Sequence, residues 1–333
     1  MNNQKIIYNA EDTVNYQLVS SEEEDTAEAS QVVSESICAV ASETNKSDAS
    51  KSQDAFCHQY VKEANANIIA IADGAGGSFR SEIGSRFVVK KAVELISDTL
   101  LKGVTDIDFN NVFDVIQQEF DKEIELQFEG HMEEIPDSKT NSNFGTTLIV
   151  GIDFPEKFVA AYIGNGSILH LNSRFVTFPN YVAFPWNVIN ILNPHTVDHE
   201  GKESLYKLFF YKGRKETHTP SVISLQKDTA GDGELFVLTT DGIYSNDHEN
   251  PAQDAEGNIW LPISSQLYSL YKCMKEYVLG DQIITNETLH KAITTYLLSL
   301  KDSHGLNDDT TLGVFISPIA CKYFEKRKKS GNS

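Results

Sequence analysis

Hydrophobic residues recur along the chain in two patterns, and each pattern predicts a different element. Short, nearly continuous apolar runs predict buried strands. They occupy 36–41, 67–72, 146–152, 158–163, 167–171, 235–239 and 312–316. Apolar positions three or four residues apart, with charged residues on the opposite side, predict amphipathic helices. These lie around 83–96, 113–124, 263–278 and 287–300.

The order of these elements predicts the fold class and the domain limits. Two helices stand together between hairpin-linked strands, which favours an α+β fold with antiparallel sheets and outer helices over strict strand–helix alternation. We expect one domain over 31–320, with an irregular insertion at about 172–233 that contains four prolines. Residues 1–30 are acidic and are predicted to be flexible, and 321–333 form a basic tail.

Composition narrows the class of protein without identifying it. The chain has 333 residues and a net charge of −20, which disfavours nonspecific binding to nucleic acid or to anionic membranes. Its four cysteines form no Cys-x-x-Cys pair, and we find neither a signal peptide nor an apolar run long enough to span a bilayer. These features predict a soluble, cytoplasmic protein, and they leave its oligomeric state open.

Three apolar strands adjoin an aspartate. Strands predicted at 67–72 and 235–239 lead to Asp73 and Asp241, each followed by glycine, and Asp308 and Asp309 precede the last strand. Carboxylates brought together at strand ends repel one another unless a cation neutralises them. Oxygen ligands without histidine or cysteine favour Mg²⁺ or Mn²⁺ over Zn²⁺. Each Asp-Gly pair alone is also typical of an ordinary turn, so the prediction depends on the set.

The set resembles the metal-dependent protein phosphatases of type 2C, and in particular their bacterial branch. The motifs that carry the resemblance occur in the family's order: S-K-S-Q-D-A-F at 50–56, D-G-A-G-G at 73–77, G-T-T at 145–147, I-G-N-G at 163–166, T-T-D-G at 239–242 and D-D-T-T at 308–311. The resemblance covers about residues 31–318. It implies a sandwich of two antiparallel β-sheets flanked by α-helices.

The same resemblance implies a reaction and a set of site residues. Two Mn²⁺ or Mg²⁺ ions would be held by Asp73, the Gly74 carbonyl, Asp241 and Asp308, with Asp73 bridging both ions. Asp54 would orient a coordinated water molecule. The four aspartates are thus the candidate catalytic residues, and the substrate would be a phosphoserine or phosphothreonine protein.

Several positions depart from the family's pattern. Gln53 replaces a glutamate, Ala75 replaces a histidine of many eukaryotic members, and Asn165 and Ser245 replace aspartates linked to a third metal. We therefore expect that third site to be weak or missing.

The family's phosphate-binding arginine is also absent, because Ala49 stands in its place. Four basic residues are candidates to replace it: Lys46, Lys51, Arg80 and Arg86. These departures motivate an alternative, a non-catalytic regulatory or phosphate-sensing module on the same fold. A phosphohydrolase of small molecules is a third possibility.

Overall fold

The structure is a computed structural model, and it describes residues 37–46, 52–137, 142–172, 187–199, 202–227, 234–242, 252–253, 259–260, 285–303, 306 and 308–317. The predictions for residues 1–30, for the helix at 263–278 and for the tail at 321–333 lie outside these ranges. The remaining predicted helices and all seven predicted strands lie wholly or almost wholly within them.

Two five-stranded antiparallel sheets form the centre of the fold. The first has the order β1-β14-β11-β6-β7, formed by Ile37–Glu43, Thr310–Ile316, Glu234–Thr239, Ser167–Asn172 and Asn187–Asn190. The second has the order β10-β5-β4-β3-β2, formed by Ser221–Gln226, Lys157–Ile163, Leu148–Asp153, Ala66–Ala72 and Ala55–Val61. Two small hairpins are separate from the sheets: β8–β9 at Thr196–His199 and Lys202–Leu205, and β12–β13 at Ala252–Gln253 and Ile259–Trp260.

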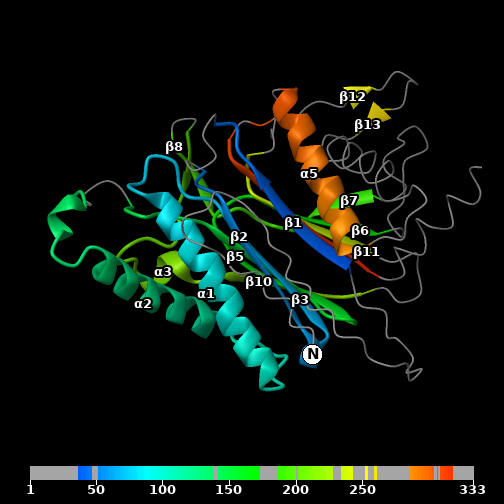
Figure 1. The fold of residues 1–333 in the computed structure, drawn as a ribbon, viewed down its shortest axis with the longest axis horizontal. Coiled ribbons are helices and arrows are strands. Elements are labelled where there is room, and N and C mark those ends of the chain that lie inside the picture. Colours follow the sequence, from blue (N-terminus) through cyan, green and yellow to red (C-terminus); the bar gives the residue numbers. More distant parts are fainter. Residues whose placement is uncertain are drawn as a thin grey trace, which may run out of the picture.

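Helices cover the outer faces of both sheets (Figure 1). On the second sheet lie α1 (Ser81–Leu101) and α2 (Phe109–Gln127), and on β1 of the first sheet lies α5 (Asn286–Asp302). The short helix α3 (Lys215–His218) packs on α2. The other helical elements in the described part of the chain are two 3₁₀ turns, at Lys62–Ala64 and Met132–Glu134. This arrangement confirms the predicted α+β sandwich.

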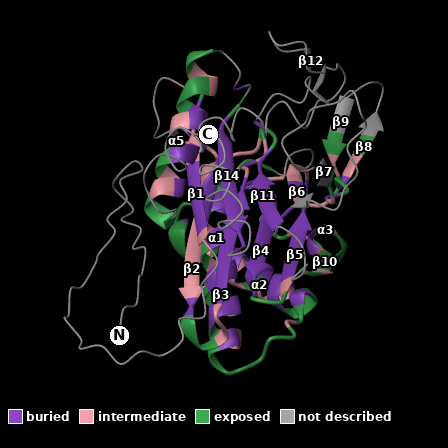
Figure 2. Cartoon of the chain, turned by 90° about the vertical axis from the view of Figure 1, so that its right-hand side faces the viewer, coloured by how far each residue is buried: buried purple, intermediate pink, exposed green. Residues whose placement is uncertain are grey.

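Two hydrophobic layers hold the sandwich together, and they account for the buried strands in Figure 2. Between the sheets, Phe158 of β5 stacks on Phe236 of β11 with ring centroids 3.9 Å apart. Between the second sheet and its helices, Phe113 and Phe120 of α2 are fully buried. Strands packed on both faces are rigid, so residues at their ends are held in fixed positions.

The segment at 172–233, expected to be irregular, contains regular edge strands. Its described parts include β7, which pairs with β6, and β10, which pairs with β5 along six residues. Strand β10 alternates between half-buried and exposed positions, with Ile223 and Leu225 packed against the inter-sheet core. The prolines lie outside β10, so they delimit this strand and do not prevent it.

Strand β2 was not predicted, because its central residues Cys57, His58, Gln59 and Tyr60 are only half-buried and mostly polar. It is an edge strand, where one side of the ladder is open and polar residues are tolerated.

Among the helices that the structure describes, none combines the length and the apolar character that a membrane span requires.

Candidate active site

Strands from both sheets place the candidate aspartates at one end of the sandwich. Strand β3 ends at Ala72 and continues into Asp73, and β11 ends at Thr239, two residues before Asp241. Strand β14 runs antiparallel to β11 and begins at that same end, directly after Asp308 and Asp309. Residues remote in sequence therefore meet because the sheet topology brings their strand ends together.

The four candidate aspartates lie close enough together for their charges to interact. Burial raises the pKa of Asp73 well above its usual value, and the negative charges of Asp54, Asp241 and Asp308 raise this pKa further. A carboxyl group surrounded by three others is stabilised in its protonated form unless a positive charge is present. The structure therefore brings Asp54, Asp73, Asp241 and Asp308 together around one acidic centre.

Asp54 lies at the buried side of this centre. Its Oδ2 accepts hydrogen bonds from the Thr240 hydroxyl at 2.8 Å and the Thr311 hydroxyl at 2.7 Å. Burial raises the pKa of Asp54 to about 7, although the two threonine hydrogen bonds lower it. Among the described residues, Oδ1 has no hydrogen-bond donor, and the Asp54 carboxyl group interacts with that of Asp73. Two carboxyl groups can share a hydrogen bond only when one holds a proton.

This donor set fits divalent cations of the oxygen-binding type. A cation could replace the proton shared by Asp54 and Asp73, because it would neutralise the same carboxyl charges. Within the described ranges, no group of three or more histidine, cysteine, aspartate or glutamate side chains forms a ready-made metal cage. Mg²⁺ does not require one, since it keeps several water ligands and takes only one or two carboxylates from the protein.

The backbone at Asp73 and Gly74 is fixed by hydrogen bonds to neighbouring loops. The Asp73 carbonyl accepts from the Thr146 hydroxyl and the Thr147 amide, both at 2.9 Å. The Gly74 amide donates to the Gln53 carbonyl at 3.1 Å. A Cβ at position 74 would lie 2.8 Å from Ser81 Oγ, so only glycine fits here without displacing helix α1.

Asp241 and Asp308 stand at the exposed side of the centre, and protein donors hold both. The Asn165 amide group donates to Asp241 Oδ2 at 2.6 Å. The Asp309 amide donates to Asp308 Oδ1 at 2.8 Å. Asn165, which replaces an aspartate in the family's pattern, therefore positions Asp241. Ser245 lies outside the described residues, and the expectation about a third metal site stays a prediction.

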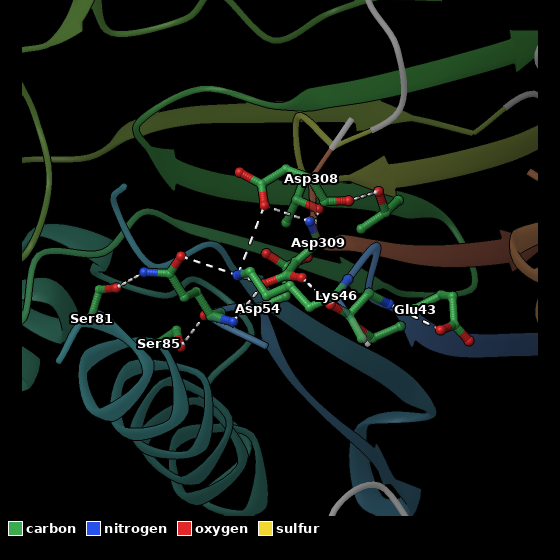
Figure 3. A network of polar contacts seen from close by, with 12 residues as sticks. Glu43, Lys46, Asp54, Ser81, Ser85, Asp308 and Asp309 are labelled. Carbon is green, nitrogen blue, oxygen red and sulfur yellow. Dashed lines mark hydrogen bonds and ion pairs between the residues drawn. The ribbon is translucent and has the colours of Figure 1, made fainter. Parts of the chain in front are cut away.

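A hydrogen-bonded network centred on Asp309 was not foreseen from the sequence. Asp309 is buried, and its carboxylate accepts three hydrogen bonds. The donors are the Thr44 hydroxyl, Lys46 Nζ at 2.7 Å and the backbone amide of Gln53 at 2.7 Å. Figure 3 shows Lys46 between the carboxylates of Asp308 and Asp309. The Asp-Asp sequence signalled two acidic groups, but it did not indicate that the second would be buried against a lysine.

The four basic candidates for phosphate binding are in different surroundings. Lys46 Nζ lies within the acidic centre. Arg80 pairs with Glu82 at 3.3 Å, and Arg86 is exposed on helix α1. Lys51 lies outside the described residues. Of the described three, Lys46 is the cation placed among the aspartates.

His195 is buried beside the turn that carries Asn165. It is 4% exposed, and its ring stacks on Tyr162 with centroids 5.1 Å apart. Its Nδ1 accepts from the Gly164 amide at 3.2 Å, and Nε2 contacts Ser221 Oγ at 2.8 Å. Burial lowers its pKa to about 4, so the ring is neutral at pH 7. His195 supports the turn that carries Asn165, which sequence spacing alone did not indicate.

Comparison with known proteins identifies the family and the fold. The family model for protein phosphatase 2C matches residues 43–285. In fold, the chain is similar to a bacterial serine phosphatase, with 16% identity, coverage of 84% of this chain and 96% of that chain, and a TM-score of 0.50. It is also similar to the *S. agalactiae* serine/threonine phosphatase, with 14% identity, coverage of 85% and 99%, and a TM-score of 0.50. A *C. elegans* sex determining protein matches with 12% identity, coverage of 88% and 68%, and a TM-score of 0.56. No curated protein matches the chain.

The α+β sandwich with an acidic centre at its strand ends is consistent with a phosphatase-type hydrolase. The family match covers most of the chain, and the chain belongs to the protein phosphatase 2C family. Membership of this family makes the chain a protein phosphatase, and a non-catalytic module on the same fold is not favoured.

Proposed function

We propose that this phosphatase hydrolyses phosphoserine and phosphothreonine side chains at the acidic centre, with two divalent cations, Mn²⁺ or Mg²⁺. The observation that supports this most directly is the meeting of Asp54, Asp73, Asp241 and Asp308 beside the ends of β2, β3, β11 and β14. A site with so much uncompensated negative charge favours cation binding.

Four groups would hold the cations: the carboxylates of Asp73, Asp241 and Asp308, and the Gly74 carbonyl. Asp73 is central, because the charges of the other acidic residues all act on it. Bound together, two such cations lower the pKa of a shared water molecule and withdraw charge from the phosphoryl oxygens.

Asp54 would orient the attacking water from the buried side of the centre. Thr240 and Thr311 hold its Oδ2, which fixes the orientation of the Asp54 carboxyl group beside Asp73. A carboxylate placed beside the coordinated water could accept a proton from it. The water oxygen attacks phosphorus, and the bond from phosphorus to the seryl or threonyl oxygen breaks on the opposite side.

The leaving oxygen would take its proton from solvent. Ala75, which follows Gly74, has no acidic group, and its backbone amide already donates to the Gly145 carbonyl at 2.8 Å.

We further propose a cytoplasmic location. The two described cysteines, Cys38 and Cys57, are both free thiols, which fits a reducing compartment.

The test is hydrolysis of a phosphothreonine peptide with excess Mn²⁺, by the wild type and by Asp241→Asn. The substitution keeps the shape of the side chain and removes one anionic ligand, so activity should fall at least about 100-fold with an unchanged circular dichroism spectrum. Asp98→Asn, on the outer helix α1 and remote from the acidic centre in sequence, is the control and should retain activity. A wild type without Mn²⁺-dependent turnover would contradict the proposal.

A further inference from the structure

The buried carboxylate of Asp309 has no role in the mechanism above, although it adjoins Asp308. It is 1% exposed, and a charge so deeply buried is costly unless it is paired and hydrogen-bonded. Lys46 provides the pairing, with Nζ 2.7 Å from Oδ2, and its side chain is 30% exposed. The pair joins the loop after β1 to the beginning of β14.

This ion pair is connected to Asp308 in two ways. The Asp309 amide donates to Asp308 Oδ1 at 2.8 Å, so fixing Asp309 also orients the neighbouring carboxylate. Lys46 Nζ itself lies 4.0 Å from the same Asp308 oxygen. Because Asp308 is otherwise exposed, these two contacts limit its freedom.

The pair is also connected to the other side of the centre through Gln53. The backbone amide of Gln53 donates to Asp309 Oδ2 at 2.7 Å, and its side-chain Oε1 accepts from Lys46 Nζ at 3.3 Å. The Gln53 carbonyl accepts from the Gly74 amide, and Asp54 is the next residue in the chain. The hydroxyl groups of Ser81 and Ser85 on α1 also contact Gln53, and Figure 3 shows both beside the network.

We propose that the Lys46–Asp309 ion pair is a positioning device that holds the metal-binding groups of this phosphatase in place. The inference rests on the proposed function, because it concerns the same cation site. Lys46 acts here through Asp309 and Gln53, so we class it as a positioning residue. A lysine that contacts only the substrate phosphate would not need a buried carboxylate partner.

The direction in which Lys46→Met changes Mn²⁺ affinity separates a positioning role from a purely electrostatic one. If Lys46 only added positive charge, Lys46→Met would make the centre more negative and would tighten Mn²⁺ binding. If Lys46 positions the ligands, the same variant binds Mn²⁺ more weakly. Residues that orient metal ligands typically contribute about 10- to 100-fold in metal affinity or activity.

The experiment is calorimetric titration of the full chain with Mn²⁺, together with kcat and KM for a phosphothreonine peptide. For Lys46→Met we expect the Mn²⁺ dissociation constant to rise about 10- to 100-fold and kcat at saturating Mn²⁺ to fall, with KM within about twofold. Lys46→Arg should stay near the wild type, because its guanidinium can still pair with Asp309. Lys91→Met is the matched control: it removes a lysine paired with Glu94 at 3.0 Å on helix α1, and it should leave all three quantities unchanged.

Asp309→Asn serves as a second variant if Lys46→Met does not fold. Asparagine can still accept from the Gln53 amide, but it cannot form the ion pair, so weaker Mn²⁺ binding and lower kcat are again expected. Unchanged or tighter Mn²⁺ binding by Lys46→Met would overturn the inference, and so would an effect confined to KM. Where Lys46→Met cannot be measured, wild-type values for Asp309→Asn would overturn it. A wild type that neither binds Mn²⁺ nor turns over substrate would instead refute the proposed function.

Discussion

Gly242, which follows Asp241 directly, has no space for a side chain. A Cβ at this position would lie 2.0 Å from the Asp309 carbonyl oxygen and 2.3 Å from Thr310 Oγ1. The first of these contacts is with backbone, which cannot rotate away as a flexible side chain would. Gly242→Ala therefore pushes the end of β11 away from the beginning of β14.

The size of the effect follows from that distance. Real Cβ atoms essentially never approach within 3.0 Å of another heavy atom, so the two segments must separate by at least 1.0 Å. Overpacking of this kind typically costs about 1–3 kcal/mol in the free energy of unfolding. Asp241 and Asp308 stand on the two segments that separate, and a displacement of about 1 Å at reacting groups can cost about 100-fold in rate.

The assay is Mn²⁺-dependent hydrolysis of the phosphothreonine peptide, with thermal unfolding followed in parallel. Gly76→Ala is the steric control, because a Cβ there would have no heavy atom within 4 Å. We expect Gly242→Ala to lose about 100-fold in kcat/KM and Gly76→Ala to remain near the wild type. Full activity in Gly242→Ala would show that the spacing of the two strand ends does not matter for the reaction.

Two further predictions concern stability. The folded-state pKa of His195 is about 4, below its unfolded value of about 6.5, so its contribution is present above pH 6.5 and is lost as the pH falls toward 4. Between pH 7 and pH 5 the free energy of unfolding should therefore fall by about 2 kcal/mol on account of this residue. Asparagine cannot be protonated in this range, so urea unfolding of His195→Asn should show a smaller fall in stability. A fall identical to that of the wild type would contradict the assignment. Lys227 pairs with Asp153 at 2.5 Å, and both side chains are buried. Lys227→Met should lower the free energy of unfolding, measured in urea, by about 3–5 kcal/mol. It should not change kcat, because Asp153 lies at the end of β4 that is away from Asp73. A large fall in kcat under conditions where the variant is fully folded would contradict this.

The apolar runs indicated the central strands, because such runs record burial on both faces of a sheet. The resemblance to the type 2C phosphatases implied that these strands form a sandwich. The sequence did not indicate β2, since the central residues of this edge strand are half-buried and mostly polar. Nor did it indicate β10, because the four prolines spread over 172–233 suggested an irregular segment. Edge strands bury little surface, so hydrophobic patterning records them weakly.

The candidate site was also predicted only in part. Asp73, Asp241 and Asp308 were predicted together because each adjoins a buried strand and belongs to an ordered set of motifs. The supporting contacts of Asp309 with Lys46, and of His195 with the turn at Asn165, were not predicted. They depend on which loops meet in space, and no local spacing in the chain records that.

The central claim is that the aspartates at these strand ends together bind two divalent cations. A crystal structure grown with Mn²⁺, with anomalous scattering measured at the manganese edge, tests it directly. The account predicts two peaks about 3.5–4 Å apart, both bound by Asp73, with Asp241 and Asp308 among the other ligands. No peak in this centre, or peaks that these carboxylates do not contact, would contradict it.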